Sequence, residues 1–394
     1  MRRIRALPDE MHVAPQTAET LPAEARHARW LSVGTEDVPV SASADERLSD
    51  VTNAEERAII QYRLFGAIPV KSVTVIRSED VMLVPGGFAV GITIRTQGVL
   101  VVGVGTVDTD QGALSPGATA GLKAGDVILQ VNGENVHSAE HLSELTDASA
   151  GAVILTVERA GEPLALSMQP VLDVADGIRR IGLWVRDSTA GIGTTSFYDA
   201  TLRWFCALGH PVSDIDTQSL LSIREGRIVA TKIVDVRRGE QGSPGELIGV
   251  FSVTEKPAGM ILVNSEYGIF GTVEAAPEHP LYGEIPMGYA FEAHEGPAEM
   301  LATVSGDGIQ AFDCEVVRVN QQADAAVKGM IVDITDEALM SATGGIVQGM
   351  SGCPVVQDGK LIGVVTHVFV NDPTRGYCVY AEWMYEQMRS SASG

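Results

Sequence analysis

The sequence predicts a mainly β protein with more than one domain, and three observations lead to this prediction. The chain has 394 residues, enough for two or three domains at roughly 100–200 residues each. Short apolar and β-branched segments alternate with turns that contain glycine or proline along most of its length. Amphipathic segments of helical length are scarce, and residues 381–389 are the best candidate. This pattern favours antiparallel barrels or sandwiches over a doubly wound sheet.

The charge balance and the cysteine content exclude several classes of function. The chain carries 28 Lys and Arg against 51 Asp and Glu, which gives a formal net charge of −23. Because the phosphate backbone of nucleic acid attracts basic surfaces, we expect no nucleic-acid partner. Four cysteines without a Cys-x-x-Cys pair provide neither a disulfide framework nor a zinc site. Hydrophobic residues make up 45% of the chain, which predicts folded domains rather than global disorder.

The amino-terminal part of the chain divides into an arm and a β segment. Residues 1–55 are rich in Ala, Glu, Asp, Ser and Thr, which predicts a flexible acidic arm with one strand near residues 11–13. Apolar sequence then predicts a β segment over residues 56–86. No apolar run reaches the roughly 18–20 residues of a membrane-spanning helix, and no apolar core follows the basic start. The protein is therefore expected to be cytosolic, or to have an export segment outside this chain.

Residues 87–172 show the pattern of one compact domain. The run Gly-Leu-Lys-Ala-Gly-Asp-Val-Ile-Leu-Gln-Val-Asn-Gly at residues 121–133 contains a strand that ends in a strong turn dipeptide. Ser138 can cap the helix that follows, and residues 153–159 form a further strand. This order of elements closely resembles a PDZ domain.

The resemblance to a PDZ domain implies a groove beside a sheet edge, where a peptide adds as an extra strand. By position, the loop that holds the terminal carboxylate of the peptide falls on Ala89, Val90, Gly91 and Ile92, whose backbone N–H groups are the expected donors. The alternative is a PDZ domain that docks only within its own chain and takes no external ligand.

The most informative stretch for chemistry has the form Gly-x-Ser-Gly-x-Pro at residues 349–354. A serine hydroxyl needs a base to take its proton and donors to hold the oxyanion. Glycines around Ser351 let the backbone turn sharply, so that the N–H groups of Gly349 and Ser351 point at one spot, as in chymotrypsin-type enzymes. The Gly-x-Ser-x-Gly motif of α/β-hydrolases is absent, because residue 353 is Cys. The alternative is a glycine-rich hairpin with an ordinary serine.

A candidate base precedes this serine in the chain. His210 follows the apolar aromatic segment 204–206, and the order His then Ser matches that of chymotrypsin. A lone histidine is more often structural than catalytic. Seven aspartates lie between the two residues, and the sequence alone does not rank them as the acidic partner: Asp214, Asp216, Asp235, Asp307, Asp313, Asp333 and Asp336.

Four segments resemble the stage IV sporulation protein B peptidases of endospore-forming bacteria: residues 191–198, 207–214, 344–352 and 366–374. The similarity runs from about residue 59 to residue 388 and includes the PDZ domain. It implies a chymotrypsin-like serine peptidase domain over residues 178–390.

Carried over by position, the family's base falls on His210, its nucleophile on Ser351 and its acidic partner on Asp336, with Asp214 in reserve. Cys353 departs from the family, which commonly has a small hydroxyl residue there, and a cysteine nucleophile is the minor alternative. The resemblance implies no cofactor. His137 and His141 have a zinc-like i, i+4 spacing but no third ligand, so we expect no metal.

The resemblance also implies a biological role. Family members are exported across the forespore membrane into the intermembrane space, cleave themselves, and cut a membrane-anchored regulator of an intramembrane protease that controls a sigma factor. Membrane association would then depend on an amino-terminal segment missing from this chain. The PDZ ligand would be a peptide, including one from the protein's own chain. The alternative function is a catalytically silent PDZ peptide-binding regulator.

Overall fold

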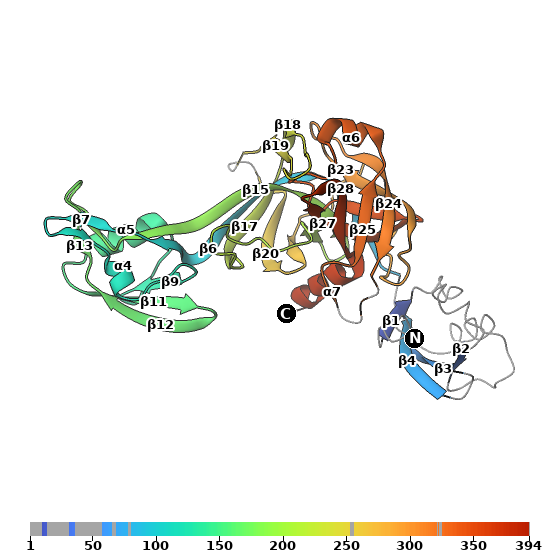
Figure 1. Cartoon of the computed structure of the whole chain (residues 1–394), viewed down its shortest axis with the longest axis horizontal. Coiled ribbons are helices and arrows are strands. Elements are labelled where there is room, and N and C mark those ends of the chain that lie inside the picture. Colours follow the sequence, from blue (N-terminus) through green and yellow to red (C-terminus); the bar gives the residue numbers. More distant parts are fainter. Residues whose placement is uncertain are drawn as a thin grey trace.

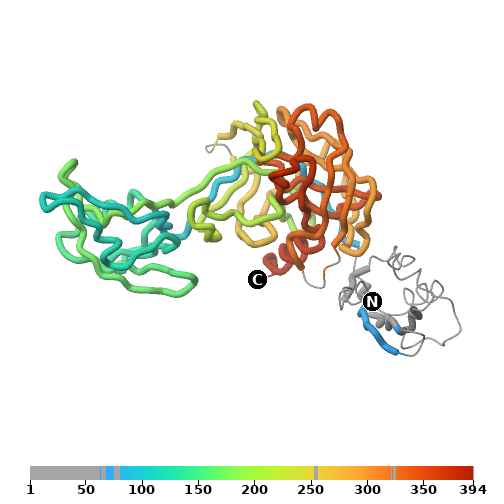
Figure 2. Tube along the Cα trace, in the orientation of Figure 1, coloured from blue at the N-terminus to red at the C-terminus, as the bar shows by residue number. Residues whose placement is uncertain are grey.

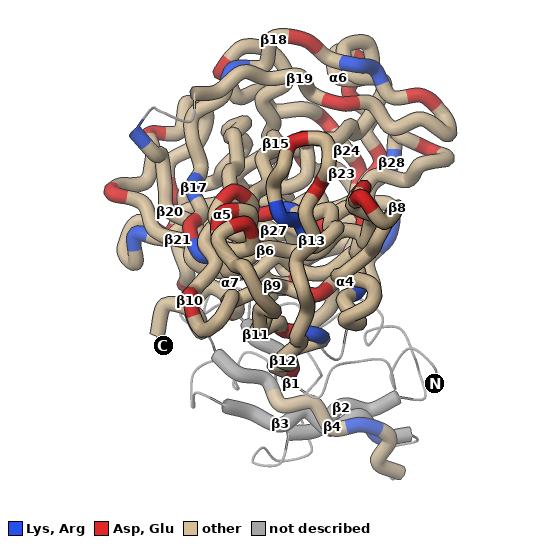
Figure 3. Tube along the Cα trace, turned by 90° about the vertical axis from the view of Figure 1, so that its left-hand side faces the viewer, with Lys and Arg blue, Asp and Glu red and all other residues tan. Residues whose placement is uncertain are grey.

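The structure is a computed structural model that describes residues 10–13, 31–35, 57–64, 68–77, 80–252, 256–320, 322 and 325–393. Figure 1 shows an elongated molecule, with a PDZ unit at one end, a larger β body in the middle and a small sheet at the other end. Figure 3 shows Asp and Glu positions spread over the trace, with fewer Lys and Arg positions between them.

The small sheet contains the first four strands in the order β1-β4-β3-β2. Their bounds are β1 (Glu10–Val13), β2 (Leu31–Thr35), β3 (Arg57–Leu64) and β4 (Ile68–Arg77). The predicted strand near residues 11–13 is confirmed by β1, and the predicted β segment begins with β3. Apart from β1 and β2, the predicted flexible arm lies outside the described residues.

The PDZ unit folds around a core of Leu and Val side chains. Its elements are β7 (Val107–Thr109), β8 (Gly112–Leu114), α4 (Pro116–Thr119), β9 (Val127–Val131), β10 (Glu134–Asn135), α5 (Ala139–Asp147), β11 (Val153–Arg159), β12 (Glu162–Met168), β13 (Val171–Leu172) and β14 (Arg179–Arg180). Leu142 of α5 belongs to the same buried cluster as Ile128 and Leu155 of the sheet. Ser138 caps α5 by accepting a hydrogen bond from the His141 N–H, as predicted.

A two-stranded ribbon joins the PDZ unit to the β body (Figures 1 and 2). It consists of β6 (Ala89–Val104) and β15 (Leu183–Asp199), which pair antiparallel from Leu183 opposite Val104 to Thr194 opposite Ala89. Both strands contribute to both parts of the molecule, so the structure divides the chain within these strands rather than at residues 87 and 172.

The first half of the β body is a ring of six strands. The sheet order β6-β17-β20-β21-β16-β15 is closed by the pairing of β6 with β15. The remaining bounds in this half are β5 (Met82–Pro85), β16 (Trp204–Ala207), β17 (Ile223–Ala230), β18 (Lys232–Arg237), β19 (Glu246–Val250), β20 (Gly259–Ser265), β21 (Gly268–Thr272) and β22 (Ile285–Pro286). Phe205 and Ile228 lie in its fully buried core.

The second half is a closed barrel in the order β23-β24-β25-β28-β27-β26. Its elements are β23 (Gly296–Ala302), β24 (Gln310–Val319), β25 (Met330–Ile334), α6 (Glu337–Thr343), β26 (Pro354–Gln357), β27 (Lys360–Phe369), β28 (Asp372–Tyr380) and α7 (Ala381–Ala392). The predicted carboxy-terminal helix is confirmed by α7. Two six-stranded antiparallel barrels in sequence form a chymotrypsin-like arrangement, so the predicted mainly β fold class is confirmed.

Candidate active site

The two barrels contribute facing residues to a cavity of about 310 Å³. His210 comes from the loop after β16 in the first barrel, and Ser351 from the turn before β26 in the second. Residues 189–192 of β15 line a third side of the cavity. The structure therefore brings the predicted base and the predicted nucleophile together in one cavity.

The turn that carries Ser351 is fixed by close backbone approach. Gly352 has a φ of +102°, and a Cβ there would lie 1.9 Å from the Thr194 carbonyl oxygen, so only glycine fits. Thr194 of β15 holds the same turn, because its N–H donates to the Ser351 carbonyl and its hydroxyl donates to the Gly349 carbonyl. Contacts to the first barrel thus set the position of the serine.

Two backbone amides in this turn lack acceptors. The N–H groups of Gln348, Met350, Gly352 and Cys353 all donate to backbone carbonyls. In contrast, the N–H groups of Gly349 and Ser351 have no acceptor among the residues that the structure describes. Gly349 and Ser351 are half-buried and both line the cavity, so their neighbouring free amides beside a hydroxyl are available as donors to an oxyanion.

Ser351 and His210 are not hydrogen-bonded to each other in this state. The Ser351 hydroxyl donates to the Thr366 carbonyl at 2.8 Å. The Nδ1 of His210 lies 2.9 Å from the Pro211 carbonyl oxygen, and as the donor it leaves Nε2 free to accept a proton. Such bonds are often loose in unliganded enzymes and tighten when substrate binds.

Burial lowers the pKa of His210 from its usual value, although the hydrogen bond to Pro211 acts in the opposite direction. The imidazole is therefore neutral at neutral pH, the state that a general base requires.

A second histidine, which the sequence reasoning missed, lies beside the first. The ring centroids of His210 and His367 are 5.0 Å apart. Burial lowers the pKa of His367, and the neighbouring His210 and Lys328 lower it further. The stretch that contains His367 resembles the peptidase family, but nothing in that pattern gives the residue a role.

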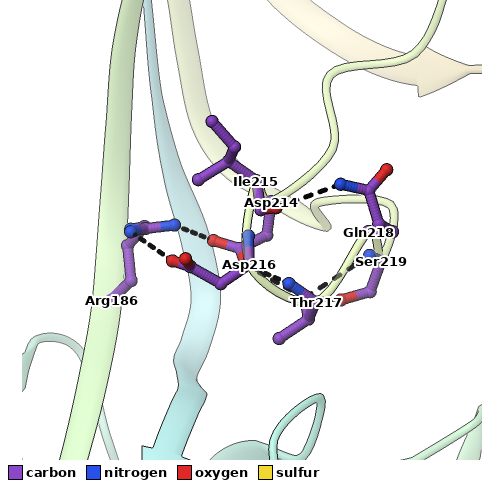
Figure 4. Close-up of polar contacts among 7 residues, drawn as sticks. All are labelled: Arg186, Asp214, Ile215, Asp216, Thr217, Gln218 and Ser219. Carbon is purple, nitrogen blue, oxygen red and sulfur yellow. Dashed lines mark hydrogen bonds and ion pairs between the residues drawn. The ribbon is translucent and has the colours of Figure 1, made fainter.

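Asn264 and Arg186 hold the loop that begins at His210. Asn264 of β20 accepts a hydrogen bond from the Val212 N–H and donates to the carbonyls of Val212 and Leu221. Arg186 of β15 forms ion pairs with two aspartates of the same loop, as Figure 4 shows. Sequence reasoning missed both residues, because neither belongs to a local motif.

Asp214, the alternative candidate for the acidic partner of His210, forms its hydrogen bonds within this loop and with Arg186. Its carboxylate is fully buried and accepts from the N–H groups of Asp216 and Thr217, from the Thr217 hydroxyl and from Arg186. Burial alone would raise its pKa, but the hydrogen bonds from Thr217 and Arg186 leave the pKa below its usual value. Asp214 therefore stabilises the loop as a charged carboxylate and does not contact His210.

The structure does not bring Asp336 to His210. Asp336 precedes α6, and its carboxylate accepts a hydrogen bond from the Leu339 N–H at 2.8 Å, so it acts as the N-cap of this helix. It is not among the residues that line the cavity. The role predicted for Asp336 from the family resemblance therefore has no supporting contact here.

The predicted carboxylate-binding loop of the PDZ domain is wrong. Residues 89–92 lie within β6 and pair with β15 on one edge, and residues 90–92 also pair with β17 on the other edge. Because neighbouring strands occupy both edges at residues 90–92, their backbone N–H groups cannot receive a peptide.

A cavity of about 590 Å³, called the PDZ groove below, lies instead between α5 and the start of β15. Leu142, Ser143 and Thr146 of α5 line one side of it, and residues 181–183 line the other. The signal for this site is the sequence Ile-Gly-Leu at 181–183, with Gly182 at a φ of +68°. It was missed because this strand follows the helix in the chain instead of preceding it.

The weaker candidates do not form sites. The rings of His137 and His141 stack at 5.4 Å, and His141 approaches Glu134 at 3.5 Å. No group of three metal-binding side chains occurs among the described residues. Cys353 is fully buried, and burial raises the pKa of its thiol to about 12, which argues against a thiolate nucleophile. No helix in the described part of the chain is long and apolar enough to cross a membrane.

Solved structures that match parts of the chain include a PDZ domain and two proteases. The PDZ domain of the SdrC-like protein from Listeria monocytogenes is 19% identical and covers 23% of this chain and 87% of its own, with a TM-score of 0.19. The Rv3671c protease from M. tuberculosis in its active form is 13% identical over 51% of this chain and 74% of its own, with a TM-score of 0.30.

The third structure, the HtrA-type protease AlgW with a decapeptide, is 11% identical over 63% of this chain and 66% of its own, with a TM-score of 0.27. A search of curated proteins finds no match.

Two family models match the chain. The PDZ domain model matches residues 107–159, which include α5 and the strand that precedes it. The model of the SpoIVB peptidase S55 family matches residues 177–385, more than half of the chain, and this range contains both His210 and Ser351. The chain is thus a PDZ-containing serine peptidase and belongs to the SpoIVB peptidase S55 family.

Proposed function

We propose that this peptidase cleaves internal peptide bonds with Ser351 as nucleophile and His210 as general base. The observation that carries the proposal is the joint position of a hydroxyl, a neutral imidazole and two unpaired amides around one cavity. In acylation, the Ser351 hydroxyl leaves the Thr366 carbonyl and gives its proton to Nε2 of His210. The Oγ atom then bonds to the substrate carbonyl carbon, and the N–H groups of Gly349 and Ser351 hold the oxyanion.

His210 then gives the proton to the leaving amine, and the peptide bond breaks. In deacylation His210 takes a proton from a water molecule whose oxygen bonds to the acyl carbon, and the proton passes to Ser351 Oγ as the ester bond breaks. The Pro211 carbonyl orients the imidazole by accepting from Nδ1. Asp336 is not assigned a step, because its carboxylate caps α6.

The change Ser351→Ala tests this proposal. We expect a fluorophosphonate probe to label the wild-type protein at Ser351 and peptide cleavage to fall by at least ~10³-fold in the variant. The matched control is Ser167→Ala, which removes an exposed hydroxyl on β12 and should leave both readouts unchanged. Equal cleavage by wild type and Ser351→Ala would overturn the assignment.

Membership of the family supports a further proposal about the biological substrate. The protein would act in sporulation signalling, cleave itself, and cut a membrane-associated regulator of sigma-factor processing. It would do so in the intermembrane space around the forespore. In a spore-forming host, the wild-type gene should restore processing of the sigma factor and Ser351→Ala should not. Equal restoration by both would contradict this role.

A further inference from the structure

Strand β15 has an open edge that runs from the PDZ groove to the catalytic cavity. From Leu183 to Thr194 its first edge pairs with β6. In the described part of the chain, no strand pairs with its second edge before Thr195, where β16 begins to pair. The start of the strand lines the PDZ groove, and residues 189–192 line the catalytic cavity.

The backbone groups on this open edge are available near Ser351. The Thr194 N–H donates to the Ser351 carbonyl, and the Thr194 carbonyl accepts from the Leu208 N–H, so both groups point away from β6. Because backbone groups alternate along a strand, those of Ala190 and Ile192 point the same way. Neither residue has a hydrogen-bond partner on that side among the described residues. The edge can therefore pair with an added strand.

The reaction fixes which part of a substrate lies along this edge. His210 must reach the leaving amine, so the substrate residues after the scissile bond lie on the His210 side of Ser351. Residues 210–213 line the same cavity as residues 189–192 of β15. The carboxy-terminal part of the substrate thus passes between the His210 loop and the open edge.

The PDZ groove fits the end of the same strand. An added strand antiparallel to β15 runs from Ser351 toward Leu183, and its carboxyl terminus arrives at residues 181–183. Gly182 turns the backbone there with a φ of +68°, and backbone turns of this kind can capture a terminal carboxylate. Leu142 and Ile181 give this end apolar contacts that suit an apolar last side chain, beside the polar Thr146 and the charged pair Asp173 and Arg180.

We propose that a single extended substrate occupies both the catalytic cavity and the PDZ groove. The length of β15 then sets the distance between the scissile bond and the substrate's free carboxyl terminus, and we call this device the ruler. This inference rests on the proposed function, since it assigns the cut to Ser351. Leu183 to Ile192 spans about 30 Å at roughly 3.3 Å per residue. A paired substrate strand has a similar rise, so the cut falls about 9–12 residues before a carboxyl terminus with an apolar last residue.

A peptide library tests the ruler with the full chain. The probes are 24-residue peptides, about twice the span of the ruler, with randomised interior positions and a free carboxyl-terminal Val. Mass spectrometry locates the cuts. We expect cuts to cluster about 9–12 residues from the terminus, and to keep this distance when a Gly-Ser spacer is inserted before the Val. A carboxyl-terminal amide should lower the cleavage rate by about tenfold and disperse the cuts.

Two variants that add the same negative charge, one inside the PDZ groove and one outside it, form a matched pair. Ser143→Glu sets a carboxylate in the groove, where it repels the substrate terminus, and should act like the amide. Ala148→Glu adds the same charge at the end of α5, outside the groove lining, and should keep the clustering.

Fluorophosphonate labelling of the wild-type protein separates the two proposals. Labelling at Ser351 with cuts that ignore the carboxyl terminus would overturn the ruler and leave the peptidase assignment intact. Absence of both labelling and cleavage would overturn the proposed function and the ruler with it.

Discussion

The two sides of the catalytic cavity are held by different kinds of contact. Ser351 lies in a turn shaped by its own glycines, with Gly349 and Gly352 at positive φ. His210 begins a loop that depends on side chains from elsewhere, Arg186 of the ribbon and Asn264 of β20. The conformation of the nucleophile's turn is therefore encoded by its own glycines and its position is set by backbone contacts to Thr194, whereas the base loop is held by side chains from separate elements. Loss of the Arg186 side chain is expected to displace the base, whereas crowding of Thr194 is expected to displace the nucleophile.

The largest effect on stability is expected at Gly352, where the turn that carries Ser351 has no space for a side chain. Gly352→Ala would place a Cβ against the Thr194 carbonyl in a backbone conformation that L-residues rarely adopt. We expect the free energy of unfolding to fall by about 3–5 kcal/mol and labelling of Ser351 by fluorophosphonate to be lost. Urea denaturation and the labelling rate are the measurements.

Gly359→Ala is the matched control for the serine turn. Gly359 also has a positive φ, at +74°, but no heavy atom lies within 4 Å of a Cβ there. Only the backbone strain remains, so a loss of about 1 kcal/mol and unchanged labelling are expected. Equal effects of the two substitutions would show that close contact with Thr194 does not shape the turn.

The next effect concerns the loop of the base. Arg186→Ala leaves the buried carboxylate of Asp214 without its cation (Figure 4). Because Arg186 is 33% exposed, water partly replaces it, and we expect a loss of about 1–3 kcal/mol in the free energy of unfolding. The misplaced imidazole should lower kcat by about tenfold or more, with partial recovery in Arg186→Lys.

Arg237→Ala serves as the comparison for Arg186. Arg237 pairs with Glu246 at the surface, where it is 69% exposed, so its removal should change neither stability nor kcat. If Arg186→Ala behaves in the same way, the ribbon does not position the base.

A smaller effect is expected from pH. Burial lowers the pKa of His210, and only the neutral imidazole accepts the serine proton. Activity should therefore be full at pH 7 and fall as the pH drops through the lowered pKa. The acid limb of kcat/KM, measured with a fluorogenic peptide, should have its midpoint below the usual histidine value of about 6.5. A midpoint above that value would mean that a carboxylate reaches the imidazole in the working enzyme.

Local sequence predicted the parts of this molecule that local geometry determines. The PDZ run at 121–133, the glycine conformations of the Ser351 turn and the cap at Ser138 all depend on residues close together in the chain. His210 could be proposed from chain order and from the family resemblance. The ion pair between Arg186 and Asp214 joins residues from separate elements and leaves no periodic pattern.

The prediction that residues 89–92 form the carboxylate-binding loop of the PDZ domain failed for a related physical reason. Alternating apolar residues indicate a strand but do not say which strands pair with it. Residues 89–92 have the pattern of a groove strand, yet β15 and β17 occupy both edges at residues 90–92. The strand beside α5 comes later in the chain, after β14, so only the tertiary structure identifies it.

The smallest effect is expected at Asp336, where cap and catalytic roles predict different outcomes. Asparagine caps a helix about as well as aspartate, so Asp336→Asn should change stability by only a few tenths of a kcal/mol and leave kcat within about twofold. Asp336→Ala loses the cap and should cost about 1 kcal/mol. A triad aspartate would behave otherwise, because its replacement by asparagine stabilises the wrong imidazole tautomer and lowers kcat by about 10⁴-fold. Such a loss in Asp336→Asn, with stability unchanged, would show that the carboxylate leaves α6 to join His210 during catalysis.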